Sequence, residues 1–329
     1  MNLFWQNKSF VHEFIFQGFS VSEKSQLFIF VVILNIYLFT LFGNLLIVSL
    51  VCLCPSIQNP MYIFLGNFSF TEICYTTVII PQILVHTQQE RKVISYIRCL
   101  LQLYFLGPTE FFLLTVMAYD RYAAICSPLR YSYIMNEKVC QHLAVVSWMS
   151  GFFTGWTLTI PTAMLNFCGP NVINHFFCDF VPLVKLSCSD TSVSETVFFS
   201  LAWVVVLSSL SFSTISYSFI IKTILKIPSS LGRQKAFSTC AAHLTVLIIF
   251  YGTCIFLYVR PRASFLSDKD KILSLIYSVI TPCLNPLIYT LRNREFKQAL
   301  IKHRHLLLLQ WYLRFTKEKS IEQQENLHC

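Results

Sequence analysis

Charged residues are scarce in this sequence. Of its 329 residues only 12% are Asp, Glu, Lys or Arg, whereas 55% are hydrophobic. Soluble globular proteins carry about 25% charged residues, so this chain lacks the charge that a soluble surface of its size requires. The hydrophobic content also excludes a disordered chain, which is poor in apolar residues. Together with a mean hydropathy of +0.58, the composition indicates a protein that crosses a membrane several times.

Glycine is scarce as well, with nine residues in the whole chain. Nucleotide-binding loops need glycines because the backbone must approach the phosphates closely. The sequence has no phosphate-binding loop, no Gly-x-Gly-x-x-Gly motif and no nucleophile elbow, so we predict no enzymatic activity and no required cofactor. The net charge of +9 does not indicate nucleic-acid binding either, because the basic residues stand singly between apolar runs.

Long uncharged stretches predict the architecture. A helix needs about 20 apolar residues to cross the hydrocarbon layer, and the first stretch, from Lys24 to Glu72, is long enough for two helices divided at Pro55 and Pro60. The apolar runs do not alternate with polar residues as barrel strands do. We therefore predict an all-α membrane protein, a bundle of seven transmembrane helices near residues 27–53, 61–85, 97–123, 140–165, 196–225, 236–259 and 271–291.

The distribution of basic residues predicts the orientation. Most lysines and arginines fall on the inner side if the N-terminus lies outside, as the positive-inside rule requires. We thus expect an extracellular N-terminus at 1–26 with a glycosylation site at Asn7, a transmembrane domain at 27–291, and a cytoplasmic amphipathic helix and tail at 292–329. No cleaved signal peptide is visible, and we predict a multi-pass protein of the plasma membrane.

Two acidic residues, Glu72 and Glu110, lie deep within the expected spans. Ionisable groups at that depth usually face the bundle interior and are paired or hydrated. Asn44 and Asn285 lie at comparable depth in other spans. Two nearby carboxylates do not both ionise cheaply without a counterion, so we predict one interior cluster of these four residues around a proton or Na⁺.

Four cysteines fall on the expected outer side, where disulfides form. They are Cys99, Cys168, Cys178 and Cys188. Four cysteines allow three pairings, and spacing alone does not choose among them.

Asp120-Arg121-Tyr122 stands at the inner end of the expected third span, within the run Met117–Cys126. Other motifs accompany it in a fixed order along the chain: Gly43-Asn44, Pro60–Leu65, Ser216-Tyr217, Lys235–Leu244 and Asn285–Tyr289. This ordered set resembles the vertebrate olfactory receptors of the tetrapod-type subgroup, within the rhodopsin-like G-protein-coupled receptors. The resemblance covers about residues 8–303.

The resemblance implies a receptor that binds small, volatile, mostly apolar odorants inside the bundle. It would activate a heterotrimeric, stimulatory olfactory-type G protein and raise cAMP. The residues implied in the activation switch and in G-protein coupling are Asp120, Arg121, Tyr122, Tyr217, Lys235, Asn285, Pro286 and Tyr289. Those implied in ligand binding are Tyr104, Leu201, Val205, Tyr251, Cys254, Ile255 and Tyr258.

The resemblance also implies two disulfides, Cys99–Cys178 and Cys168–Cys188. In the resting state Asp120 would restrain Arg121. The family places an ion-linked polar cluster at Asn44, Glu72, Glu110 and Asn285, which agrees with the interior cluster that the burial of the acids predicts.

The segment between Cys99 and Glu110 departs from the family pattern, because it is about three residues shorter. Three residues correspond to ~4.5 Å of helix and ~300° of rotation. Either the Cys99 end is pulled inward, or the helix loosens near Gly107-Pro108, where proline removes a backbone hydrogen bond. One alternative is therefore a pocket-damaged or nonfunctional receptor variant. A second, independent alternative is a small membrane transporter, although the sequence lacks the internal repeats of transporters.

Overall fold

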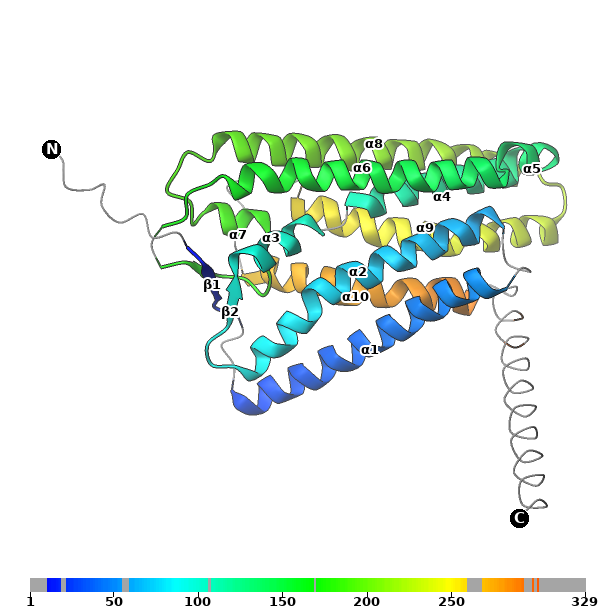
Figure 1. The fold of residues 1–329 in the computed structure, drawn as a ribbon. Helices are drawn as coiled ribbons and strands as arrows, with labels where there is room; N and C mark the ends of the chain where they lie inside the picture. Colours follow the sequence, from blue (N-terminus) through cyan, green and yellow to red (C-terminus); the bar gives the residue numbers. More distant parts are fainter. Residues whose placement is uncertain are drawn as a thin grey trace, which may run out of the picture.

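The computed structural model describes residues 11–18, 22–54, 59–105, 108–168, 170–258 and 268–292, and the single positions 298 and 301. Seven helical spans in these ranges are long and apolar enough to cross a membrane. They lie side by side in one bundle (Figure 1), which confirms the predicted seven-helix fold. The expected amphipathic helix at 292–329 lies almost entirely outside the described residues.

Eight helices build the seven spans, because the third span consists of two. Helix α4 packs against α2, α6, α8 and α9 and is thus the central helix, whereas α1 packs on α2 and α10. The bounds are α1 (Glu23–Leu53), α2 (Pro60–Gln88), α3 (Tyr96–Tyr104), α4 (Pro108–Cys126), α6 (Glu137–Ala163), α8 (Ser192–Leu225), α9 (Ser230–Tyr258) and α10 (Asp268–Arg292).

Capping residues fix where several of these helices begin. The Asn59 side chain accepts a hydrogen bond from the Tyr62 backbone N–H at 3.3 Å and Pro60 occupies the first turn of α2. The Asn136 side chain accepts from the Val139 N–H at 3.1 Å at the start of α6. Asparagine caps satisfy N–H groups that have no partner within the helix. Such polar starts explain why α6 begins before the predicted apolar span, at residue 137 rather than 140.

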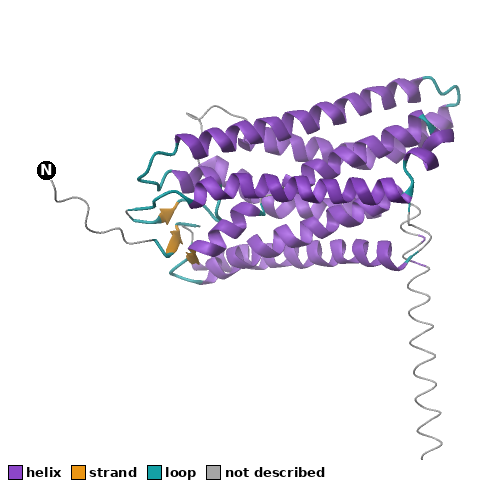
Figure 2. Ribbon diagram, turned by 45° about the horizontal axis from the view of Figure 1, so that its top comes forward, coloured by secondary structure: helices purple, strands orange, loops and turns teal. Residues whose placement is uncertain are grey.

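A small three-stranded sheet closes one end of the bundle, and the sequence did not predict it. Strand β1 (Glu13–Phe16) lies between β2 (Val93–Ser95) and β3 (Val172–Ile173), antiparallel to β2 and parallel to β3. Figure 2 shows the strands gathered at this end, which we term the sheet end. The opposite end, with Asp120 and Arg121, is the Arg121 end. The N-terminal segment expected as 1–26 thus contributes the central strand and the first turn of α1.

The side chains of β1 anchor the sheet to the bundle. Phe14 is fully buried and Phe16 nearly so, and Phe14 packs on Phe167 with ring centroids 5.3 Å apart. On the exposed side, Arg91 pairs with Glu13 at 2.9 Å. Two further short helices complete the ends, α7 (Phe180–Val184) at the sheet end and α5 (Tyr131–Ile134) at the Arg121 end; the 3₁₀ turn η2 (Pro128–Arg130) leads into α5.

Helix α3 ends at Tyr104 and helix α4 begins at Pro108, at the site of the shortened segment. We term this junction the break, although residues 106 and 107 lie outside the described residues. Proline suits the first turn of a helix because its missing N–H would have no helical partner there. Two glycines of α6 lie against the break: Gly151 packs on Thr109 and Gly155 on Tyr104. A Cβ on Gly155 would lie 2.9 Å from the Tyr104 ring. The two glycines therefore let α6 approach α3 and α4 closely on either side of the break.

Alanine in place of Gly151 is expected to destabilise the protein, because the added Cβ would overlap the side chain and backbone of Thr109. Overpacking of this kind typically costs about 1–3 kcal/mol. The measurement is the thermal unfolding of the purified protein. Gly252→Ala is the matched control, since nothing lies within 4 Å of a Cβ built there. Equal melting temperatures for the two variants would contradict the close packing at the break.

Candidate functional site

An internal cavity of about 70 Å³ lies beside the break, between α3, α4, α6, α8, α9 and α10. Its walls are mostly apolar and include Leu103 and Pro108 on the two sides of the break. Phe111 of α4 and Phe198 of α8 add aromatic surface. Ligand sites of this kind combine an apolar wall with a few placed polar groups, and the polar lining residues here are Thr154, Cys254 and Tyr277.

Three of the expected ligand-binding residues line this cavity, namely Leu201, Val205 and Cys254. Tyr251 does not line it, but its ring lies 5.9 Å from that of the lining residue Phe111. Ile255 packs on the core of the bundle. The Tyr258 side chain lies outside the described residues.

Tyr104 differs from its expected place in the pocket. Its ring packs against Trp156 and Phe152 of α6, with centroids 5.7 and 6.2 Å apart. Helix α3 ends at Tyr104, and the Tyr104 side chain lies against Gly155 of α6. Leu103, the preceding residue, lines the cavity instead.

The interior polar residues are buried in the middle of the bundle. Glu72, Glu110, Asn44 and Asn285 are each 4% exposed or less. The Asn285 amide donates a hydrogen bond to Glu72 Oε1 at 2.5 Å, which links α2 to α10. The Asn44 amide instead donates to the Thr40 carbonyl of its own helix at 3.0 Å.

Several oxygens of these residues have no hydrogen-bond partner within the described parts of the chain: Glu72 Oε2, Glu110 Oε1 and Asn44 Oδ1. Buried polar atoms are normally satisfied, so these three oxygens are exceptions among the described residues. The described residues contain no group of three or more His, Cys, Asp and Glu side chains able to hold a metal ion.

At the Arg121 end, Asp120 holds Arg121 in place. Arg121 Nε donates to Asp120 Oδ2 at 2.9 Å, and the Asp120 side chain is fully buried. The Tyr131 hydroxyl of α5 donates to the other carboxylate oxygen at 2.8 Å. Burial, together with the Asp120 charge, raises the pKa of Tyr131 well above its usual value, so this hydroxyl keeps its proton. Sequence reasoning missed Tyr131, which follows Asp120 by eleven residues in the adjoining loop.

A second contact at this end joins α8 to α9. The Tyr217 hydroxyl lies 2.9 Å from His243 Nδ1 and 3.3 Å from the Cys240 carbonyl oxygen. His243 is fully buried. It belongs to the motif Lys235–Leu244, but the sequence assigned it no role.

The other residues expected in the switch are distributed around these contacts. Tyr122 packs on Phe219 of α8, with ring centroids 5.9 Å apart. Pro286 of α10 lies against Gly43 of α1. Lys235 lies on α9 and interacts with a neighbouring group. The Tyr289 side chain and Asn7 lie outside the described residues.

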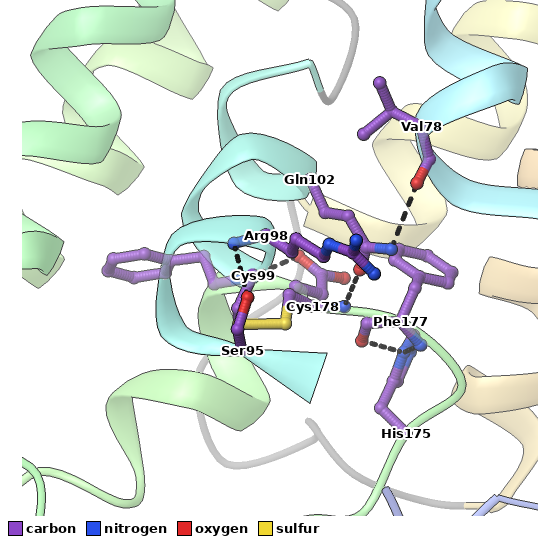
Figure 3. The surroundings of a disulfide bond; sticks show 10 residues. Val78, Ser95, Arg98, Cys99, Gln102, His175, Phe177 and Cys178 are labelled. Carbon is purple, nitrogen blue, oxygen red and sulfur yellow. Dashed lines mark hydrogen bonds between the residues drawn. A yellow bond between two sulfur atoms is a disulfide. The ribbon is translucent and has the colours of Figure 1, made fainter. Parts of the chain in front are cut away.

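At the sheet end, disulfides join Cys99 to Cys178 and Cys168 to Cys188, the pairing that the resemblance implied. Gln102 lies beside the first of them, as Figure 3 shows. Its amide donates to the Val78 carbonyl of α2 at 3.2 Å and its carbonyl accepts from the Cys178 N–H at 2.9 Å. Gln102 therefore ties the loop to α2, a role that no sequence motif indicated.

His175 in the same loop is buried, with Nδ1 3.0 Å from the Phe177 carbonyl oxygen. Burial lowers the pKa of His175 from 6.5 to about 4. The unfolded chain therefore binds a proton between these pH values that the folded chain does not bind, and stability falls as the pH falls.

Acidification from pH 6.5 to 4 is expected to lower the unfolding temperature of the wild type more than that of His175→Asn. The variant lacks the histidine with the lowered pKa but keeps all the carboxyl groups. The difference between the two pH dependences of the melting temperature therefore gives the contribution of His175. Parallel pH dependences in the two proteins would contradict a buried, neutral histidine.

Seven spans, an internal apolar cavity and an Asp-Arg pair at one end define a seven-helix membrane receptor. Residues 33–307 match the family model described as "Olfactory receptor". Olfactory receptor 6P1 of Homo sapiens is 48% identical over 295 residues, which cover 89% of this chain and 93% of that protein. Olfactory receptor 287 of Rattus norvegicus is 48% identical over 301 residues, with 90% and 96% covered. Olfactory receptor 6B9 of Mus musculus is 46% identical over 300 residues, with 90% and 95% covered.

The chain belongs to the olfactory receptor family of G-protein-coupled receptors. Members of this family are receptors and not enzymes, which agrees with the absence of nucleotide-binding and nucleophile motifs from the sequence. The human, mouse and rat relatives also agree with the tetrapod-type subgroup.

Proposed function

We propose that this chain is a working odorant receptor of the plasma membrane. Small, mostly apolar ligands bind in the cavity beside the break, and the receptor activates a stimulatory G protein to raise cAMP. The observation that carries this proposal is the cavity itself. It persists despite the shortened third span, because residues on both sides of the break line it, and this argues against a pocket-damaged variant.

The proposed orientation puts the sheet end outside the cell. Both disulfides lie at that end, and disulfides persist in oxidising compartments. The Arg121 end then faces the cytoplasm, consistent with the excess of basic residues assigned there by the sequence. Asn7, just before the sheet, would be glycosylated outside.

Activation would proceed through the contacts at the Arg121 end. A ligand that binds the active conformation more tightly shifts the population toward it. A swing of α9 away from α8 would break the contact between Tyr217 and His243, and release of Asp120 would free Arg121. Typical couplings between two sites of 1–3 kcal/mol would change G-protein affinity about 5–150-fold.

Two exposed apolar side chains in the segment that follows α4 support docking of the G protein at the Arg121 end. Leu129 in the loop after α4 is fully exposed, and Tyr133 of α5 is 85% exposed. Neither residue had been singled out from the sequence. Exposed apolar side chains that gather at one place often mark an interaction surface.

The interior cluster is the proposed relay between the cavity and the Arg121 end. The unpartnered oxygens of Glu72 and Glu110 support a shared proton or a Na⁺ ion, as the sequence predicted. Replacing sodium with choline in the assay buffer tests whether the cluster binds Na⁺. An unchanged ligand response would contradict the Na⁺ ion and favour the shared proton.

The proposed function is tested by odorant-dependent cAMP in cells that express the receptor, using a chemically diverse panel. We expect a response in the wild type and none in Arg121→Ala at equal surface expression. An equal rise of cAMP in both would contradict the assigned role of Arg121. No response to any odorant, with the receptor at the surface, would favour the nonfunctional variant.

A further inference from the structure

The polar groups of the cavity differ in what they offer to a ligand. Thr154 Oγ1 donates to the Ser150 carbonyl at 2.7 Å. The Thr154 hydroxyl can therefore accept a hydrogen bond from a ligand but has no free proton to donate. The Cys254 thiol donates to the Tyr277 hydroxyl oxygen at 3.4 Å. Every other described side chain that lines the cavity is apolar.

The Tyr277 hydroxyl therefore accepts a weak hydrogen bond from Cys254, while no hydrogen bond donated by its own proton is found among the described residues. A phenolic O–H is a much stronger donor than a thiol. Tyr277 is 6% exposed, so water competes little for this proton. The cavity thus presents one strong donor within an apolar wall.

We infer, on the basis of the proposed receptor function, that Tyr277 is the specificity-determining residue of the cavity and donates a hydrogen bond to ligands with a single carbonyl acceptor. The ligand class is small aldehydes, ketones and esters. A carbonyl accepts this bond without bringing a donor of its own, and the remainder of such a ligand is apolar like the walls.

The size of the cavity limits the ligand further. Its volume of about 70 Å³ is roughly half that of an apolar cavity of about 150 Å³ that holds benzene. The resting cavity therefore admits a few heavy atoms, and a ring of six atoms requires its walls to move outward. We expect affinity to fall as the ligand grows beyond a single six-membered ring, because larger ligands displace the walls further.

The test compares two probes of nearly equal shape, cyclohexanone and methylenecyclohexane, which differ in one acceptor oxygen. Binding is measured on the purified receptor as the rise of its unfolding temperature during titration. We expect the wild type to bind cyclohexanone about tenfold more tightly, the effect of one buried hydrogen bond. Tyr277→Phe is expected to bring the ratio close to one.

Tyr75→Phe is the matched control. Tyr75 is equally buried and donates to Ser278 at 2.8 Å, but it does not line the cavity. This variant loses a buried hydroxyl and should keep the tenfold preference. Cys254→Ala should keep it as well, because it removes the thiol and leaves the phenol.

Three results of the binding test would overturn the inference: no preference in the wild type, no binding of either probe, or a preference that survives in Tyr277→Phe. The comparison in the wild type needs no variant, so a folding defect in Tyr277→Phe does not remove the test. A preference for cyclohexanone without any cAMP response would instead count against the proposed signalling function. A cAMP response to odorants with no role for Tyr277 would overturn the inference alone.

Discussion

Serine in place of Cys178 is expected to remove most of the receptor from the cell surface, and to lower the unfolding temperature of the remainder more than the loss of Cys188. The disulfide Cys99–Cys178 closes a segment of 79 residues, whereas Cys168–Cys188 closes one of 20. The entropy removed from the unfolded chain by a disulfide grows with the closed segment. It corresponds to about 4.5 kcal/mol for the longer segment and about 3.3 kcal/mol for the shorter one.

The packing around Cys178 adds to this difference. Its backbone N–H is held by Gln102, and Cys99 and Cys178 are both fully buried. Loss of the bond therefore frees the loop from α3 and also weakens its contact with α2. Cys168, in contrast, is exposed.

The measurement is surface display by flow cytometry, followed by thermal unfolding of the purified variants. Cys52→Ser is the control, since Cys52 is free and exposed. The double variant Cys99→Ser with Cys178→Ser should be no worse than either single variant, because both singles already lack the same bond. A larger loss in Cys188→Ser than in Cys178→Ser would contradict the expected ranking of the two disulfides.

Asparagine in place of Asp120 is expected to raise cAMP in the absence of ligand by about tenfold or more. Asp120 is fully buried and pairs with Arg121, whose side chain is 12% exposed. Removal of one partner of a buried ion pair costs about 3–5 kcal/mol. That loss falls on the resting state alone, because the proposed active state has already released Arg121. The population therefore shifts toward activity without a ligand.

Tyr131→Phe is expected to act in the same direction with a smaller effect. It removes one hydrogen bond to the Asp120 carboxylate and leaves the ion pair with Arg121. Glu137→Gln is the control, since it neutralises an exposed acid at the same end whose carboxylate accepts a hydrogen bond from Gln141. Unligated cAMP at the wild-type level in Asp120→Asn, with normal surface display, would contradict the restraint. An equal rise in Glu137→Gln would show that charge alone is responsible.

The spans could be predicted from the sequence because lipid imposes a simple rule on composition. The predicted spans are all helical, and apart from the division of the third span into α3 and α4 the differences lie at the helix ends. Helix α1 begins at Glu23 and not at residue 27. Its first turn is polar, and a prediction from apolar stretches does not include polar residues.

Contacts between distant short segments could not be predicted. Strands β1 to β3 have two to four residues each, too few for a periodic pattern. Their pairing depends on the disulfide loop that brings them together. Gln102 and Tyr131 were missed for the same reason, because their partners lie on other elements and a single polar residue carries no pattern.

Tyr104 lies outside the cavity, unlike its expected place, which was transferred from the family across the segment between Cys99 and Glu110 that is about three residues shorter here. Residue-by-residue transfer assumes one continuous helix from Cys99 to Glu110 with about 100° of rotation per residue, but α3 ends at Tyr104 and α4 begins at Pro108. Leu201 and Val205 of α8 and Cys254 of α9 line the cavity, and their role in ligand binding stays a prediction. The burial of Glu72 and Glu110 was predicted from their positions within the expected spans and required no comparison with a family.

The break between Tyr104 and Pro108 also makes the two halves of the third span independent in length. Helix α3 is fixed by the Cys99 disulfide and Gln102, whereas α4 is fixed by its packing against four neighbouring helices. In an unbroken helix, each deleted residue would rotate Asp120 and Arg121 by about 100° relative to Cys99. Because α3 and α4 are held by separate contacts, the orientation of Asp120 and Arg121 follows from the packing of α4 and not from the position of Cys99.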